Sequence, residues 1–338
     1  MCDLRALVFK RALFCLAVGL PLLLNSHVLF PAAASPAKVQ TGAVGSATST
    51  PEVSTELTEA QSLLAKGLFR DAENISRSYV SKHPDAANGH YLLGQILFTE
   101  QRPKESLAEY TEGAKYHEPN AFDLKVVALD YVLLFDYLDA DKWLTKSLQW
   151  NPNDSEAWYY LGRTKYNENR FEEAVKSFER CLKLDSSNVK AEDNLGLSYQ
   201  GLGRVDDAIT AYRTAIAWQS QSANQNPQPY IDLGSLLLEQ GKIEDAIAYL
   251  RQAIAVSPQA AKAHEQLGKA YMNKNQFVQA QEELEKAVAL NPKDAPLHYV
   301  LGQVYRKRGL MDKAKAEFDR FSSLQEHQAA PEVHGPPE

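Results

Sequence analysis

Cysteine is scarce in this sequence: there are three among 338 residues, and two of them, Cys2 and Cys15, lie within the first fifteen positions. The body of the chain has only Cys181, which lies on the apolar face of a helical pattern. A lone buried cysteine forms no internal disulfide and is compatible with either redox compartment. Internal disulfides are therefore excluded as a source of stability in the body of the chain.

Strand signals and catalytic signatures are also missing. No convincing run alternates apolar and polar residues with a period of two, so we expect an all-α fold. The glycines are spread one per helical segment with no strand before them, which excludes a phosphate-binding glycine loop. No Ser/His/Asp or Cys/His set recurs at one end of these segments. The sequence therefore predicts no enzyme and no cofactor.

The chain has no excess of basic residues. Its formal net charge is −7, with 36 Lys and Arg against 43 Asp and Glu. Non-specific contact with nucleic acid requires concentrated Lys and Arg to neutralise phosphates. We therefore expect no nucleic-acid partner.

What the chain does contain is one short pattern repeated at a fixed step. Small residues recur inside apolar helical patterns every 34 residues, except for one step of 38 before Ala246: Ala72, Ser106, Ala140, Ala174, Ala208, Ala246, Ala280 and Ala314. A second series keeps the same phase and the same longer step: Gly94, Ala128, Gly162, Gly196, Gly234, Gly268 and Gly302. A period in this range indicates a solenoid of two-helix units rather than one globular core.

Residues 155–188 illustrate one unit. Apolar residues recur at helical spacing in two segments, and the short polar stretch 167–170 between them leaves room only for a tight helical hairpin. Gly162 in the first segment and Ala174 in the second would let the two helices approach closely.

These residues resemble the tetratricopeptide repeat (TPR) family. The strongest matches are the stretches 195–199 and 301–305, Leu-Gly-Leu-Ser-Tyr and Leu-Gly-Gln-Val-Tyr, each followed by an in-phase glycine, alanine and aromatic residue. The resemblance implies an all-α, right-handed superhelical solenoid of about eight helix–turn–helix units, which start near residues 53, 87, 121, 155, 189, 227, 261 and 295.

Some units depart from the family pattern. The third unit has Ala128 in place of glycine and Phe135 where a glycine usually joins the two helices. The four extra residues fall within 219–228, so we expect a longer loop between units five and six. His90, His264 and His298 share one place in their units; His264 and His298 could in principle share a metal, but helix packing explains them better, and we predict no metal site.

The two ends of the chain differ from the repeats. Lys10 and Arg11, an apolar run and a small-residue segment ending at Ala34 have the form of a secretory signal. We predict a signal peptide at 1–34, a disordered linker at 35–52, the solenoid at 53–327 and a disordered tail at 328–338. Export to the periplasm or outside the cell is expected. The alternative is an uncleaved N-terminal segment that anchors the chain in a membrane.

The resemblance implies that the first helix of each unit lines a concave face, where a partner would bind. Units two and three present an apolar stretch there, which is either tight packing or a groove for a partner segment. Units four and five present donors and aromatic rings typical of peptide contacts. The candidate partner-binding residues are Tyr91, Leu92, Phe98, Phe122, Val126, Leu129, Tyr159, Arg163, Tyr166 and Asn194.

The leading hypothesis is an exported, non-catalytic TPR scaffold that binds a protein or peptide through its concave face. One alternative is an accessory subunit of a cell-envelope export or assembly complex. Another is the regulatory partner of a separate glycosyl- or peptide-modifying enzyme. Phe321 and Leu324 lie on the last repeat, so we also consider self-association through that end, or the inward packing of Phe321.

Overall fold

The computed structural model describes residues 54–329, and within them the chain is helical with no strand. This confirms the predicted all-α fold. The predicted signal peptide at 1–34, the linker at 35–52 and most of the predicted tail lie outside the described residues. No helix of the described part is both long enough and apolar enough to cross a bilayer.

The chain divides into two compact units, with the boundary inside a helix after Ile75. The first contains α2 (Thr55–Ala65) and the beginning of α3 (Phe69–Lys82). Leu57, Ala60 and Ala72 are its buried apolar side chains among the described residues.

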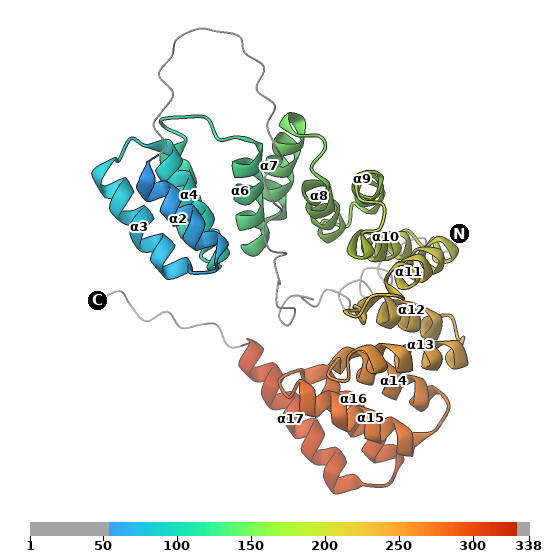
Figure 1. Ribbon diagram of the computed structural model, residues 1–338. Helices are drawn as coiled ribbons and strands as arrows, with labels where there is room; N and C mark the ends of the chain where they lie inside the picture. The colour runs from blue at the N-terminus through green and yellow to red at the C-terminus, as the bar shows by residue number, and fades with distance from the viewer. Residues whose placement is uncertain (1–53, 330–338) are drawn as a thin grey trace, which may run out of the picture. The chain divides into compact units, whose positions relative to one another are not determined.

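The second compact unit is a succession of helical hairpins (Figure 1). Its helices from α4 onward alternate between a first and a second member of each hairpin. They are α4 (Ala87–Thr99), α5 (Pro103–Gly113), α6 (Ala121–Leu133), α7 (Tyr137–Trp150), α8 (Ser155–Asn167), α9 (Phe171–Leu184), α10 (Val189–Gly201), α11 (Val205–Gln219), α12 (Gln228–Glu239), α13 (Ile243–Val256), α14 (Ala261–Asn273), α15 (Phe277–Leu290), α16 (Ala295–Lys307) and α17 (Met311–Ala329).

Each hairpin turns at a residue in the left-handed backbone region. The residues in this conformation are Gly67, Gln101, Phe135, Asn169, Gly203, Gly241, Asn275 and Gly309, with φ between 56° and 76°. Glycine and asparagine adopt this region at little cost, whereas a bulky side chain is disfavoured there. Phe135 is therefore the least suited of these residues to its turn.

In units two and four to eight, a glycine of the first helix makes room for a large side chain of the second. A methyl group built on Gly196 would lie 2.6 Å from the ring of Tyr212, which is fully buried. Gly268 stands in the same relation to Leu284, again at 2.6 Å. The side chain that lies against the glycine is therefore not the small residue of the second helix itself. It is the residue four positions later, as Tyr212 is after Ala208.

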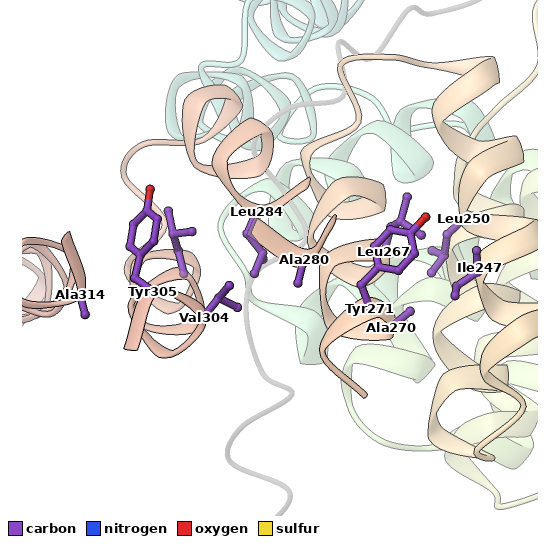
Figure 2. Close-up of a cluster of buried hydrophobic side chains, with 11 residues drawn as sticks. Ile247, Leu250, Leu267, Ala270, Tyr271, Ala280, Leu284, Val304, Tyr305 and Ala314 are labelled. Carbon is purple, nitrogen blue, oxygen red and sulfur yellow. The ribbon is translucent and has the colours of Figure 1, made fainter. Parts of the chain in front are cut away.

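The core continues from one hairpin to the next instead of closing within each. One cluster links Ile247 in α13, Leu267 in α14, Leu284 in α15 and Val304 in α16 (Figure 2). Cys181 in α9 is fully buried, and burial raises the pKa of its thiol to about 12, which keeps it protonated at neutral pH. A core of this kind couples each unit to its neighbours.

Helix contacts follow a regular order. From α5 to α15, each second helix packs against the first helix of the following unit, as α7 does on α8 and α9 on α10. First helices of consecutive units also contact each other, from α4 through α14. We call the surface formed by α4, α6, α8, α10, α12 and α14 the first-helix face.

Candidate binding face on the first helices

The apolar candidates on α4 and α6 divide by exposure. Leu92, Val126 and Leu129 have exposed fractions of 7% or less and lie in the core between neighbouring helices. Packing accounts for these three side chains, because their apolar surface is already covered by neighbouring side chains. The buried apolar candidates on α4 and α6 are therefore core residues.

Three other apolar candidates reach the surface to different extents. Phe122 is exposed and lies 5.6 Å from the Lys125 ammonium, while Tyr91 and Phe98 are half-buried. The Tyr91 ring stacks on Tyr110, and its hydroxyl donates to the carbonyl of His117. Burial is the main reason that the pKa of Tyr91 rises to about 12. Tyr91 is thus held in place, and Phe122 remains accessible.

On α8, Tyr159 and Arg163 lie side by side one turn apart. The Arg163 guanidinium is 5.9 Å from the centre of the Tyr159 ring, a distance suited to a cation–π contact. Both residues are half-buried. Burial raises the pKa of Tyr159, so its hydroxyl stays protonated and can donate a hydrogen bond at neutral pH.

Tyr166 and Asn194 complete the polar candidates, and both are half-buried. The Tyr166 ring lies 5.5 Å from that of Phe171, which fixes its orientation at the end of α8. Asn194 Nδ2 donates to the Lys190 carbonyl at 2.8 Å. The helices α8 and α10 contact each other. The face therefore places the tyrosine rings of α8 next to the helix that carries the Asn194 amide.

The sequence interpretation missed a pair of buried carboxylates beside these residues. Asp193 on α10 has an exposed fraction of 3%, and its Oδ1 has no hydrogen-bond partner. Asp232 on α12 accepts a hydrogen bond from Gln228 Nε2 at 2.9 Å, but its Oδ2 is buried and unpaired. No sequence signal marks this pair, because Lys190 precedes Asp193 by three residues just as Lys262 precedes Glu265, yet only Lys262 forms the ion pair.

The three histidines that share one place in their units are held by hydrogen bonds at both ring nitrogens. His264 Nδ1 lies 2.6 Å from Glu283 Oε2, and its Nε2 lies 3.0 Å from the Pro258 carbonyl oxygen. His90 and His298 repeat this arrangement with their own glutamate and proline. Both ring nitrogens of each histidine therefore face acceptors, so the ring bridges the two helices of a hairpin and the turn before it.

Unit four shows the same bridge with a different side chain. Trp158 Nε1 donates to the Pro152 carbonyl at 2.9 Å, from the position that histidine occupies elsewhere. Indole has one donor, so it makes the bond to the turn without the bond to a glutamate. If the ring at this position links the first helix to the preceding turn, tryptophan can replace histidine there, as it does in unit four.

At the other end of the chain, Phe321 turns toward its own hairpin. Its ring lies 5.2 Å from that of Tyr299, and the residue is half-buried. The inward-packing alternative accounts for Phe321. Leu324 is half-buried as well.

Helical hairpins that repeat along the chain and share one continuous core define a helical-repeat solenoid protein. Models of the tetratricopeptide repeat match residues 57–118, 155–188, 188–259, 237–287, 268–309 and 295–328. The chain belongs to the tetratricopeptide repeat family. The matched ranges leave out residues 119–154, which hold the divergent third unit.

Curated relatives share segments of the repeat region. Human PEX5-related protein is 26% identical over 160 residues, which make up 46% of this chain and 22% of that protein. The peroxisomal targeting signal receptor of Saccharomyces cerevisiae is 34% identical over 91 residues, 27% of this chain and 14% of the receptor. The chain thus spans less than a quarter of the length of these relatives.

Solved structures share the fold. A tetratricopeptide repeat protein from Parabacteroides merdae has a TM-score of 0.60 and 19% identity, covering 74% of this chain and 97% of its own. PilW, described as a type IV pilus biogenesis factor, has a TM-score of 0.53 and 20% identity, covering 62% and 95%. Both likenesses concern the solenoid fold alone. The tetratricopeptide repeats themselves support a protein-interaction scaffold.

Proposed function

We propose that this chain is a non-catalytic scaffold that binds a protein or peptide segment on the first-helix face of units four and five. The observation that carries the proposal is the row of half-buried side chains on α8 and α10, formed by Tyr159, Arg163, Tyr166 and Asn194. These residues combine aromatic surface with hydrogen-bond donors, a combination enriched where binding energy concentrates.

The backbone of this face supports the same function. Its helices are held by a core continuous with the neighbouring units, so a ligand meets a surface that is already formed. A preformed surface reduces the entropy lost on binding, which favours an extended ligand that makes many modest contacts. The peroxisomal relative is named as a receptor for a targeting signal, which also favours a peptide segment as the ligand here.

Site-specific photo-crosslinking in the native cell tests this proposal. A benzoylphenylalanine placed at Tyr166 or Asn194 of the full-length chain should give discrete crosslinked adducts. The same probe at Lys176, which is exposed on the second helix α9, is the matched control and should give none or far fewer. Adducts from Lys176 equal to those from Tyr166 would place the binding surface elsewhere.

We also propose that the chain is exported through its N-terminal segment, with cleavage after Ala34. The support is the order of Lys10 and Arg11, the apolar run and the small residues that follow it. N-terminal sequencing of the protein recovered from the cell envelope should begin at Ser35. A sequence that begins at Met1 would favour the membrane-anchored alternative.

A further inference from the structure

One position of the first helix buries a charged side chain in three different units. Lys125, Asp193 and Glu265 occupy it in units three, five and seven, in phase with the repeat. Their exposed fractions are 7%, 3% and 6%. A buried charge is retained only when other groups compensate it, so each of these residues requires a partner.

Two of the three find that partner within the chain. Lys125 Nζ lies 3.0 Å from Asp154 Oδ2 and 2.7 Å from Glu156 Oε2. Glu265 lies 2.8 Å from the ammonium of Lys262 and 2.5 Å from that of Lys269. Although burial opposes its charge, these two lysines lower the pKa of Glu265 below the ordinary value.

Asp193 has no such partner. Its Oδ1 has no hydrogen-bond partner, and within residues 54–329 no ion pair joins it to Lys190, the counterpart of Lys262. The acidic group that interacts with it, Asp232, carries the same charge.

Burial and the neighbouring Asp232 carboxylate raise the pKa of Asp193 well above its usual value. Burial likewise raises the pKa of Asp232, although the hydrogen bond from Gln228 and the charge of Lys262 lower it in part. Two carboxyl groups thus lie close enough to repel each other. Among the described residues no lysine or arginine forms an ion pair with either of them, and Lys262, whose charge acts on Asp232, is paired with Glu265 at 2.8 Å.

The surroundings of this pair suit a long cationic side chain. Asp232 is half-buried, as are Asn194 on the neighbouring helix α10 and Tyr166 on α8, whereas Asp193 lies deeper. After the larger effect of burial, the charge of Asp232 helps to raise the pKa of Tyr166, and both carboxylates help to raise the pKa of Tyr212. Aromatic faces next to carboxylates are favourable for guanidinium and ammonium groups.

We propose that Asp193 and Asp232 together receive one arginine or lysine side chain of the protein partner bound on the first-helix face. This inference rests on the proposed function and specifies the chemistry of its ligand. The cation takes the place that Lys269 holds beside Glu265 in unit seven, where unit five has Leu197. A long aliphatic stem passes the half-buried rim formed by Asn194 and Tyr166, and the charged head reaches the pair.

A peptide library with one fixed central residue tests the proposal. The probes are acetylated nonapeptides in which the central residue is fixed and the flanking residues are a mixture of uncharged amino acids, captured on the immobilised full-length chain. We expect the arginine-fixed and lysine-fixed pools to be retained most strongly. The double variant Asp193→Asn/Asp232→Asn should lose at least tenfold of that retention, because a buried charge pair loses its attraction when one side is neutralised.

The matched control is Asp206→Asn/Asp245→Asn. It removes the same charge from units five and six, but at exposed positions of the second helices α11 and α13. It should keep the basic preference nearly unchanged, and raised salt should weaken that preference only modestly because the pair is buried. Melting curves of both double variants confirm that they fold; neutralising a repulsive pair should not lower stability.

The outcomes separate the two proposals. Retention of the basic pools that survives Asp193→Asn/Asp232→Asn, or a stronger retention of neutral or acidic pools, overturns the receptor pair while leaving a peptide-binding scaffold in place. No retention of any pool overturns the proposed peptide-binding function and this inference together. Loss of the basic preference in the test variant alone supports the pair as the receptor.

Discussion

The third and seventh units share one backbone plan but fill four equivalent positions with different chemistry. In both, a first helix and a second helix meet at a left-handed turn. The residues that differ are, in the order third then seventh unit, Leu124 and His264, Ala128 and Gly268, Asp130 and Ala270, and Phe135 and Asn275. Unit seven follows the family pattern, whereas unit three lies in the range that the family models leave unmatched.

The difference teaches that the hairpin is fixed by its neighbours as much as by its own motif. Leu144 and Leu148 of α7 pack with Ala157 and Leu161 of α8, so the core of unit three is completed by unit four. Because the solenoid couples adjacent units, a unit with weak local signals folds against stronger ones. Four predictions test which of its substitutions are tolerated and which carry a cost.

The largest expected effect concerns Asp130, a carboxyl that is fully buried where unit seven has Ala270. Ser106 Oγ lies 2.9 Å from the Gly94 carbonyl oxygen and 2.5 Å from Asp130 Oδ2. One hydroxyl proton cannot serve both acceptors, so a protonated Asp130 that donates to Ser106 satisfies the geometry. Burial raises the pKa of Asp130 from 3.8 to about 8, in agreement with this arrangement.

Since the folded state holds this proton more tightly, the contribution of Asp130 to stability is complete below pH 4. It is lost as the pH rises toward 8, by about 1.4 kcal/mol per pH unit. The variant Asp130→Asn cannot ionise and should overtake the wild type in urea unfolding between pH 5 and 8. The exposed control Glu172→Gln should follow the wild type at every pH. Parallel curves for Asp130→Asn and wild type would contradict a raised pKa.

The second prediction concerns the histidine bridge that unit three lacks. His264→Leu places in unit seven the side chain that unit three has at Leu124. It removes both hydrogen bonds of the ring and leaves the Glu283 carboxylate, which is mostly buried, with Lys286 as its remaining partner. We expect a loss of about 2–3 kcal/mol in the free energy of unfolding.

The double variant His264→Leu/Glu283→Leu should recover part of that loss, because the abandoned carboxylate is removed as well. Leu124→Met in unit three, which conserves volume, should cost less than about 1.5 kcal/mol. Hydrogen exchange of the α14 and α15 amides measures the effect locally. Equal protection in His264→Leu and wild type would mean that the bridge is not a source of stability.

The sequence predicted the repeat because each unit repeats the same few steric requirements. A glycine facing a large side chain and a small residue on the second helix recur in phase, and this is visible without coordinates, as for Gly196 and Ala208. Unit three was recognised by phase alone, since Ala128 and Phe135 break the pattern. The periodicity thus specified the fold, even where the local motif failed.

The candidate site was harder to predict because helical periodicity does not distinguish burial from accessibility on a packed face. Leu92 and Val126 were grouped with Phe122, yet the first two are buried and the third is exposed. Nothing in the sequence distinguishes Asp193 from the other polar residues of the first helices. Its importance depends on which neighbouring lysines form ion pairs with it, a property of several packed helices rather than of any single segment.

The third prediction concerns the small residue of the first helix. In unit seven a methyl group on Gly268 would lie 2.6 Å from Leu284 Cγ and 3.3 Å from the Ala280 carbonyl oxygen. Overpacking of this kind costs about 1–3 kcal/mol, and the better helix propensity of alanine offsets about 0.5–1 kcal/mol of it. Gly268→Ala should therefore lower stability by about 1 kcal/mol in chemical unfolding.

Unit three already accommodates the methyl group, as Ala128 and Leu144 are buried together in one cluster. Ala128→Gly is the reciprocal variant and should also destabilise, through a small cavity and a weaker helix. If Gly268→Ala leaves the unfolding curve unchanged, the close contact with Leu284 relaxes freely and the two units do not differ at this position.

The smallest expected effect lies at the hairpin turn of unit three. Phe135 has a φ of 60° and an exposed fraction of 57%, so its ring gains little from burial while its backbone is in a disfavoured region. Asn275 holds the same place in unit seven at a φ of 56°. Phe135→Asn should relieve part of the left-handed penalty, which is about 1–2 kcal/mol for an ordinary residue, and raise stability by up to about 1 kcal/mol. Asn275→Phe should lower the stability of unit seven by a similar amount. If Phe135→Asn destabilises the chain instead, the ring contributes packing that outweighs the cost of its backbone, and the two turns differ in energy as well as in sequence.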